Sequence, residues 1–167
     1  MTAAALDGIT VLDLGNWISA PFCAVQFSNY GADVIKVEPP RGDAARRAGP
    51  FPEDILDPEK SGLYLSLNTN KRGITLNLET AGGRAILKEL VAQADLLVEN
   101  HPPGYMDSVG LSYDALRAIN PRLVVTSVTP FGLSGPYRDY QTTDLVSFAL
   151  TNRMSHHGVA DREPINY

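Results

Sequence analysis

The hydrophobic residues of the chain gather in short runs that alternate with segments of helical spacing. One run covers residues 9–14 and a second covers residues 33–37, and short apolar runs bounded by turn residues are typical of buried strands. Between them, residues 20–30 have helical spacing, with Ser19 as the expected N-cap and Gly31 as the expected stop. This order predicts a strand–helix–strand unit with parallel strands and a right-handed crossover.

The same alternation continues along the rest of the chain. Residues 39–61 are rich in proline, glycine and charge, which predicts a long loop. Beyond this loop we expect, in order, strands 62–67 and 73–78, helix 80–94, strand 95–99, helix 113–119 with Ser112 as its cap, strand 123–128 and helix 143–154. Alternating strands and helices predict an α/β fold, in which a parallel sheet is flanked by helices.

Composition narrows the class of protein. The 167 residues carry a net charge of −5 without a basic block, which argues against a nucleic-acid partner. No apolar run reaches the ~18 residues that span a membrane, so a membrane partner is not expected. Cys23 is the single cysteine, which leaves no internal disulfide and fits the reducing cytoplasm. We expect a cytoplasmic protein with Cys23 as a small apolar residue of a helix.

Loops follow several predicted strands, and parallel α/β sheets bind ligands at this carboxyl edge. Residues 95–137 hold two such strand ends. Residues 15–21 lead into a helix N-terminus, which attracts phosphate or carboxylate groups. The dinucleotide pattern GxGxxG is absent, however, and the residues alone favour a plain strand-to-helix turn. Glu38 ends a strand, where a carboxylate can bind a ribose hydroxyl. Three nearby cations suit either phosphate binding or a solvated loop: Arg41, Arg46 and Arg47.

These residues do not by themselves specify a reaction. His101, His156 and His157 lack metal-ligand spacing, so no metal site is predicted. A nucleophile elbow and a Walker loop are both missing. The patterns indicate a cytosolic α/β domain that binds a nucleotide-like ligand.

Several segments taken together resemble the class III CoA-transferases. This family includes formyl-CoA transferase, carnitine CoA-transferase and α-methylacyl-CoA racemase. The matching segments follow one another in the order and with the spacing of the family, and they are residues 6–14, 31–40, 67–78, 97–104 and 132–137. The resemblance covers residues 6 to about 150 and is specific as a set.

The resemblance implies a Rossmann-like, CoA-binding domain and an incomplete N-terminal portion of a larger two-domain fold. Residues 1–155 would then belong to the CoA-binding domain, and residues 156–167 would begin the connection to further sequence. Family members form interlocked homodimers. They transfer CoA between carboxylic acids through an aspartyl-CoA intermediate, because an aspartate carboxylate attacks the acyl-CoA thioester. That nucleophilic aspartate is expected beyond Tyr167, so no catalytic residue is assigned here.

Carrying the family's CoA contacts over position by position gives the expected binding residues. These are Trp17, Ile18 and Ser19 near the thiol end, Leu76 and Asn77 near the adenine, and Asn100 and His101 in another turn that contacts CoA. Three family positions that are basic in formyl-CoA transferase are changed here, to Pro39, Glu79 and Ser108. We expect Arg41 or Arg46 to supply the missing phosphate contacts. The substrates implied are an acyl-CoA and a carboxylic acid, without a metal.

The racemase branch of the family has a catalytic histidine directly before the position of Asp144. This chain has Thr143 there, and threonine cannot act as a base near neutral pH. The substitution favours a transferase. Two alternatives stay open: a racemase-type enzyme, and a non-catalytic CoA-binding subunit that relies on a second chain for the nucleophile.

Overall fold

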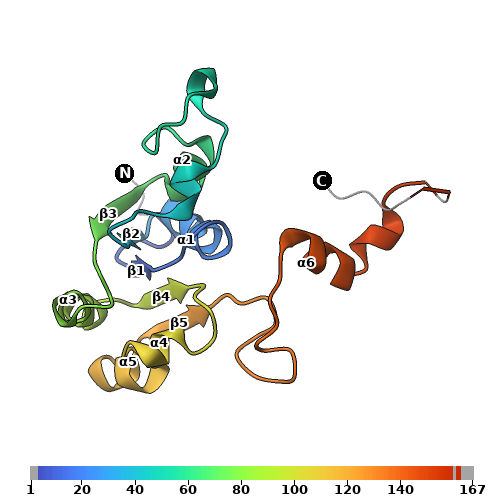
Figure 1. The fold of residues 1–167 in the computed structure, drawn as a ribbon. Helices are drawn as coiled ribbons and strands as arrows, with labels where there is room; N and C mark the ends of the chain where they lie inside the picture. Colours follow the sequence, from blue (N-terminus) through green and yellow to red (C-terminus); the bar gives the residue numbers. More distant parts are fainter. Residues whose placement is uncertain (1–3, 160, 163–167) are drawn as a thin grey trace. The chain divides into compact units, whose positions relative to one another are not determined.

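The computed structural model describes residues 4–159 and 161–162. The chain divides into two compact units, Met1–Val128 and Thr129–Tyr167 (Figure 1). The predicted boundary between residues 155 and 156 stays a prediction, and residues 160 and 163–167 of the predicted connection lie outside the described residues.

The first unit is built on a five-stranded parallel sheet with the order β3-β2-β1-β4-β5. The order reverses between the two central strands β1 and β4, because the chain leaves β1 on one side and returns on the other. This reversal is the topological switch point at which open α/β sheets bind ligands. The strands are β1 (Thr10–Asp13), β2 (Asp33–Glu38), β3 (Lys71–Thr75), β4 (Leu96–Glu99) and β5 (Val124–Ser127).

Helices cover both faces of this sheet, which confirms the predicted α/β fold class. The first unit has helices α1 (Ser19–Asn29), α2 (Gly62–Asn68), α3 (Ala81–Val91), α4 (Tyr105–Ser108) and α5 (Tyr113–Ile119), with 3-10 turns at Ala44–Arg47 and Pro52–Asp54. The second unit has α6 (Asp144–Leu150) and a 3-10 turn at Arg153–His156. Among the described residues, no helix combines the length and apolar character needed to cross a membrane.

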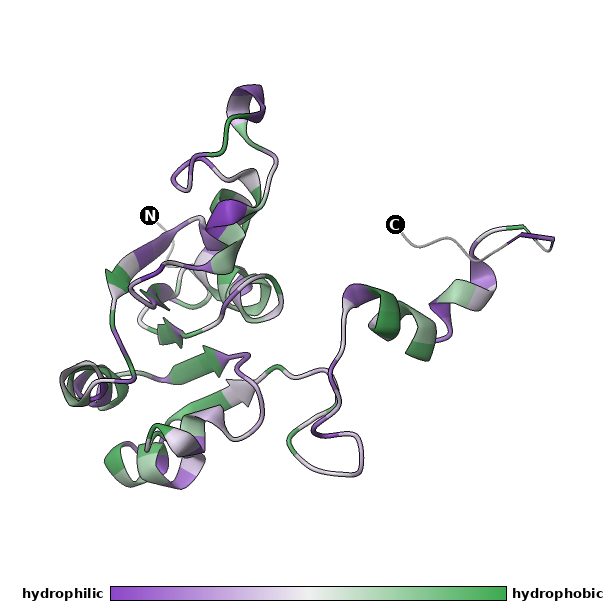
Figure 2. Ribbon diagram, in the orientation of Figure 1, coloured by the Kyte–Doolittle hydropathy of each residue, from purple (hydrophilic) through white to green (hydrophobic). Residues whose placement is uncertain are grey.

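Side chains that alternate along each strand form two separate cores, as the two-residue period of a strand requires. Val11 and Val98 pack with residues of α1 on one face of the sheet. Leu12 and Leu97 pack with residues of α3 and α5 on the other. Figure 2 shows the central strands in hydrophobic green and much of the edge strand β3 in polar purple. The central strands are therefore buried on both faces, which explains their near-continuous apolar sequences.

The prediction of a strand at residues 62–67 was wrong, because this segment is helix α2. Its alternating leucines fit a strand pattern, but the side chain of Ser61 accepts a hydrogen bond from the backbone N–H of Tyr64 and caps a helix. Ser61 is itself fully buried, and its hydroxyl donates to backbone carbonyls of the preceding loop. Tertiary contacts of the cap therefore outweigh the strand pattern. The next predicted strand, residues 73–78, is present as β3 but begins and ends earlier.

Several predicted helix ends also differ from the structure, among them the end of the helix predicted at residues 80–94, since α3 ends at Val91. Ser19 is not the N-cap of α1, because the helix begins at Ser19 and Ile18 occupies the cap position without a side-chain hydrogen bond. The last helix was predicted to reach residue 154, but α6 ends at Leu150, before Asn152 adopts a left-handed conformation with φ of 61°. The predicted cap Ser112 is confirmed, since its hydroxyl accepts from the N–H of Ala115.

Four charged side chains lie buried beneath the carboxyl edge of the sheet. Lys71 Nζ lies 2.7 Å from Asp13 Oδ2, and Lys36 Nζ lies 2.8 Å from Asp43 Oδ2. A weaker contact of 3.8 Å between Lys36 and Asp13 joins the two pairs. All four side chains are at most 1% exposed. The two positive and two negative charges balance, so none of these four side chains is buried without a counter-charge.

Replacing Lys36 with alanine tests the importance of this balance for stability. The change leaves Asp43 buried without its counter-ion, so we expect the free energy of unfolding to fall by about 3–5 kcal/mol. Urea unfolding followed by circular dichroism measures the loss. Lys60→Ala is the control, because Lys60 pairs with Asp57 at the surface and is 63% exposed. Its loss should stay below about 1 kcal/mol, and equal losses in the two variants would contradict the expectation.

Candidate functional site

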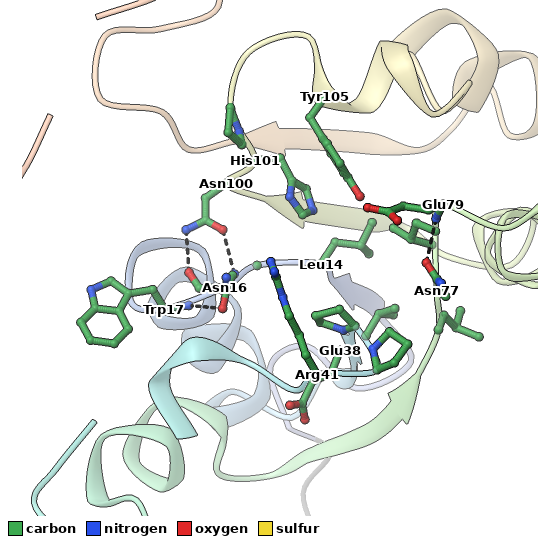
Figure 3. Close-up of a pocket in the computed structure, with 17 residues that line it drawn as sticks. Leu14, Asn16, Trp17, Glu38, Arg41, Asn77, Glu79, Asn100, His101 and Tyr105 are labelled. Atoms are coloured by element: carbon green, nitrogen blue, oxygen red, sulfur yellow. Dashed lines mark hydrogen bonds between the residues drawn. The ribbon is translucent and has the colours of Figure 1, made fainter. Parts of the chain in front are cut away.

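A cavity of about 680 Å³ opens at the carboxyl edge of the sheet in the first unit (Figure 3). Its walls are the segments that follow β1, β2, β3 and β4, and it lies at the switch point between β1 and β4. This is the edge at which the sequence predicts a ligand. A volume of this size falls within the range of small-molecule sites. The lining residues are Leu14–Trp17, Val37–Arg41, Leu76–Glu79, Asn100–Pro102 and Tyr105.

Most of the predicted binding residues line this cavity together. Ile18 and Ser19 do not, and the hydroxyl of Ser19 instead accepts a hydrogen bond from Asn100 Nδ2 at 2.9 Å. The predicted residues found in the wall are Trp17, Arg41, Leu76, Asn77, Asn100 and His101. Their contacts with CoA stay a prediction.

Gly15 brings the backbone of the first turn close to the start of α1. A Cβ atom on Gly15 would lie 2.5 Å from Ala20 Cβ and 2.7 Å from Pro21 Cδ, so a side chain has no room there. The chain therefore retains one glycine at the strand-to-helix turn, for close packing, although the full dinucleotide pattern is absent.

A reciprocal pair of hydrogen bonds joins the loop after β1 to the loop after β4. The backbone N–H of Asn16 donates to Asn100 Oδ1, and Asn100 Nδ2 donates to the carbonyl oxygen of Asn16. Both donor–acceptor distances are 2.8 Å. Figure 3 shows the Asn100 amide turned toward Asn16. The predicted residue Asn100 thus joins the two loops that flank the switch point.

His101 and Tyr105 form an aromatic wall of the cavity. Their ring centroids lie 4.4 Å apart, and the backbone N–H of His101 donates to Glu99 Oε2 over 2.7 Å. Within the described part of the chain, the buried Nε2 of His101 has no hydrogen-bond partner. Burial lowers the pKa of His101, although the nearby charge of Glu99 acts in the opposite direction. The imidazole is therefore neutral near pH 7, and its free nitrogen can bond to a ligand.

Glu38 lies at the end of β2, where its carboxylate is held by Arg46 and Tyr64. Arg46 donates to both carboxylate oxygens, with Nε at 2.7 Å from Oε2 and Nη2 at 2.8 Å from Oε1. The guanidinium also lies over the ring of Tyr64, with 3.8 Å between its Cζ and the ring centroid. The Tyr64 hydroxyl donates to Glu38 Oε1 over 2.5 Å.

These bonds show which of the two arginines expected to bind phosphate, Arg41 or Arg46, is available to do so. Arg46 is paired with Glu38 and does not line the cavity, whereas Arg41 does. No hydrogen bond or ion pair to the Arg41 guanidinium is found within residues 4–159 and 161–162. Figure 3 shows its side chain extending through the cavity. Of the three changed family positions, Pro39 and Glu79 line the cavity and Ser108 does not.

The described residues contain no group of three histidine, cysteine or acidic side chains that could hold a metal ion. The cavity lining offers the Arg41 guanidinium, the neutral imidazole of His101, amide groups, the carboxylates of Glu38 and Glu79, the Tyr105 hydroxyl and apolar walls. Such a set can bind an extended ligand with both anionic and apolar parts.

The family model named CoA-transferase family III matches residues 6–167. The chain belongs to CoA-transferase family III. This confirms the resemblance, and it explains why the binding residues expected from the family come together at one edge of the sheet.

Several known proteins are identical to this chain at more than a third of the aligned positions. It is 42% identical over 163 residues to a formyl-CoA:oxalate CoA-transferase of Streptomyces avermitilis, covering 96% of this chain and 38% of that protein. It is 44% identical over 145 residues to the succinyl-CoA:(R)-benzylsuccinate CoA-transferase subunit BbsE of Thauera aromatica, covering 87% and 35% respectively. A crystal structure of a CAIB/BAIF family protein from Brucella suis matches with a TM-score of 0.91 and 36% identity, covering 99% of this chain and 44% of that one.

The chain therefore spans well under half the length of these relatives. The prediction that it is a portion of a larger fold is confirmed by these lengths.

Sequence reasoning missed Lys36 and Asp43, which support the cavity from beneath. A signal was present, because Lys36 interrupts the apolar strand of β2 and a lysine in a buried parallel strand requires a counter-charge. Asp43 gave no comparable signal, since it lies in a loop rich in charged residues. Its role depends on a fold that returns the loop to the end of β1.

The bonds to Glu38 make stability depend on pH. Burial alone would raise the pKa of Glu38, but the hydrogen bonds from Arg46, Tyr64 and the Asp43 N–H outweigh it and lower the pKa from 4.5 to about 2. Because the folded pKa is depressed, the stabilisation is complete above pH 4.5 and is lost as the pH falls toward 2.

Urea unfolding of the wild-type protein and of Glu38→Gln from neutral to acid pH measures this effect. The variant lacks the carboxylate that titrates, so we expect the wild-type advantage to be largest at neutral pH and to shrink in the acid range. A difference that stays constant through that range would contradict the assignment of the low pKa to Glu38.

Proposed function

We propose that this chain is the CoA-binding, N-terminal part of an acyl-CoA:carboxylate CoA-transferase, which moves CoA from one carboxylic acid to another. The observation that carries the proposal is the cavity at the switch point of a family III chain, whose lining includes the unpaired Arg41 guanidinium and apolar side chains. Relatives of similar sequence are named as CoA-transferases with formyl, oxalate, succinyl or benzylsuccinate groups in their names.

The lining of the cavity suits the parts of a CoA thioester. The Arg41 guanidinium supplies a positive charge for the phosphates, and charge-assisted bonds of this kind are the stronger class of hydrogen bond. Leu76 and Asn77 provide a wall with one apolar and one polar side chain for the adenine. The free Nε2 of His101 supplies a further hydrogen bond, and the turn containing Trp17 lies toward the thiol end.

The proposed reaction uses covalent catalysis by an aspartate that follows Tyr167 in the longer protein. Its carboxylate attacks the thioester carbonyl, which forms a mixed anhydride and releases the CoA thiolate. The thiolate then attacks the aspartyl carbonyl, so that the donor acid leaves and an aspartyl-CoA thioester remains. The acceptor carboxylate repeats the two steps in reverse and leaves with CoA, which regenerates the aspartate.

We further propose that the longer protein acts in the cytoplasm as an interlocked homodimer. A racemase function has less support, because Thr143 occupies the position of the catalytic histidine of the racemase branch. Its hydroxyl caps α6 by accepting from the N–H of Val146. The possibility of a binding subunit is kept as an outcome of the tests, since BbsE is named as a subunit.

Binding of CoA tests the assignment of the cavity. Replacing Arg41 with alanine removes the unpaired cation, so we expect the Kd of CoA to rise about tenfold, as for the loss of one charge-assisted bond. Isothermal titration of the full-length protein measures Kd, and the salt dependence of binding should also become weaker in this variant.

Arg122→Ala is the matched control, because Arg122 is 89% exposed and does not line the cavity. Its Kd should equal that of the wild-type protein. If CoA binds equally well to both variants and to the wild-type protein, Arg41 is not a phosphate contact.

Mass spectrometry tests the proposed covalent step. We expect full-length protein mixed with an acyl-CoA to carry a CoA adduct on an aspartate after Tyr167, and the adduct to disappear when an acceptor acid is added. Incubation of a racemic 2-methylacyl-CoA in heavy water is the companion measurement. Deuterium uptake at the α-carbon without a CoA adduct would contradict the transferase proposal and indicate a racemase. CoA binding without either result would support a binding subunit.

A further inference from the structure

A single buried ion pair holds both ends of the turn that forms one wall of the cavity. Lys36 Nζ donates to the carbonyl oxygen of Gly15 over 2.5 Å and pairs with Asp43 Oδ2 over 2.8 Å. The other oxygen of Asp43 accepts from the backbone N–H of Trp17 over 2.9 Å. Gly15 and Trp17 both line the cavity, but neither charged side chain does.

Trp17 adopts a backbone conformation that a bulky residue rarely takes. Its φ is 67°, in the left-handed region, which costs an L-residue about 1–2 kcal/mol. Such a conformation persists only where surrounding interactions impose it. Here the Trp17 N–H points at two acceptors, Asp43 Oδ1 at 2.9 Å and Asn16 Oδ1 at 3.0 Å.

The side chain of Trp17 lies at the rim of the cavity and is 46% exposed. Figure 3 shows its indole on the far side of Asn16 from His101 and Tyr105. Because nearly half of Trp17 is exposed, we attribute its strained conformation to the hydrogen bonds that its backbone N–H donates.

Asp43 is suited to this role by its burial and by the use of both its oxygens. It is completely buried, and its Oδ1 also accepts from the Ala45 N–H over 2.8 Å, which begins the 3-10 turn Ala44–Arg47. Its own N–H donates to Glu38 Oε2 over 2.9 Å. The loop after β2 is thus anchored at Asp43, and the Asp43 carboxylate binds the turn after β1 to this loop.

We propose that Asp43, held by Lys36, is a positioning residue for the CoA substrate: it imposes the left-handed conformation of Trp17 and so shapes the rim that the thioester passes. This inference rests on the proposed function for its ligand, but the control of Trp17 by Asp43 does not.

Three variants separate this role from a general effect on stability. Asp43→Ala removes both acceptor oxygens. Asp43→Asn retains Oδ1 but turns an amide group toward the Lys36 ammonium, which repels it. The double variant Lys36→Met, Asp43→Asn removes both charges and the Lys36 bond to the Gly15 carbonyl but keeps the acceptor for the Trp17 N–H, so it should restore the Trp17 end of the turn. Leu87→Ala is the control for stability, because it opens the buried core under α3 and Leu87 does not itself line the cavity.

The position of Trp17 is read by fluorine NMR of full-length protein containing 5-fluorotryptophan, with the resonance assigned by Trp17→Phe. We expect the Trp17 resonance to shift and broaden in both single variants without ligand, and the Kd of CoA to rise about tenfold, as for the loss of one contact. The double variant should return the resonance to its wild-type position and bring Kd to within about threefold of wild type. Leu87→Ala should change neither.

Each outcome decides one part of the inference. If Asp43→Ala does not fold, the Asn variant and the double variant still report on Trp17. An unchanged resonance in Asp43→Asn overturns the control of Trp17 by the carboxylate. A shifted resonance with an unchanged Kd overturns the role in substrate positioning. If wild-type protein binds no CoA, the proposed function fails, while the resonance still decides whether Asp43 controls Trp17.

Discussion

The pairing of two buried lysines with two buried aspartates is the constraint on which the rest of the first unit depends. Charges removed from water are tolerated only with close partners of opposite sign. Lys71 belongs to the edge strand β3 and reaches Asp13 at the end of the central strand β1, while Lys36 of β2 reaches Asp43 in the following loop. The same four side chains thus connect three strands and one long loop at the edge where the cavity opens.

This arrangement explains how a cavity built from loops can keep a defined shape. Loops carry binding groups in parallel α/β folds because the rigid sheet beneath positions them. Here the support is specific: Asp43 fixes the turn at Trp17, Glu38 holds Arg46, and Asn100 joins the loops after β1 and β4. Arg41 remains without such a partner among the described residues, which makes it the cationic side chain of the lining that can turn toward a ligand.

The family relationship and the geometry support one another. Family III relatives are named as CoA-transferases, and the cavity offers the apolar walls and the anion-binding group that a CoA thioester requires. The chain spans 35% to 44% of the relatives and solved structures described above, so the catalytic aspartate and the acid-binding parts belong to the remaining length in the proposed mechanism.

Much of the fold could be predicted from the sequence because its signals are local. The apolar runs of β1 and β4 are continuous, and that of β2 is interrupted only at Lys36, because these strands are buried on both faces. Ser112 marks the start of α5 by direct capping. The alternating leucines of residues 62–67 misled for the same reason, because a local pattern could not reveal that Ser61 would be buried as the cap of α2.

The sequence by itself determined the fold class, the family and six residues of the cavity wall. Only the tertiary structure decided which arginine is free, why Ser19 and Ile18 lie outside the lining, and that Asp43 holds Trp17. These facts depend on side-chain bonds between separate elements, some of them far apart in the sequence, such as Asp43 with Trp17 at 26 positions and Asn100 with Asn16 at 84 positions. Hydrogen bonds and ion pairs of this kind form only after the sheet has brought its loops together, so no local pattern encodes them.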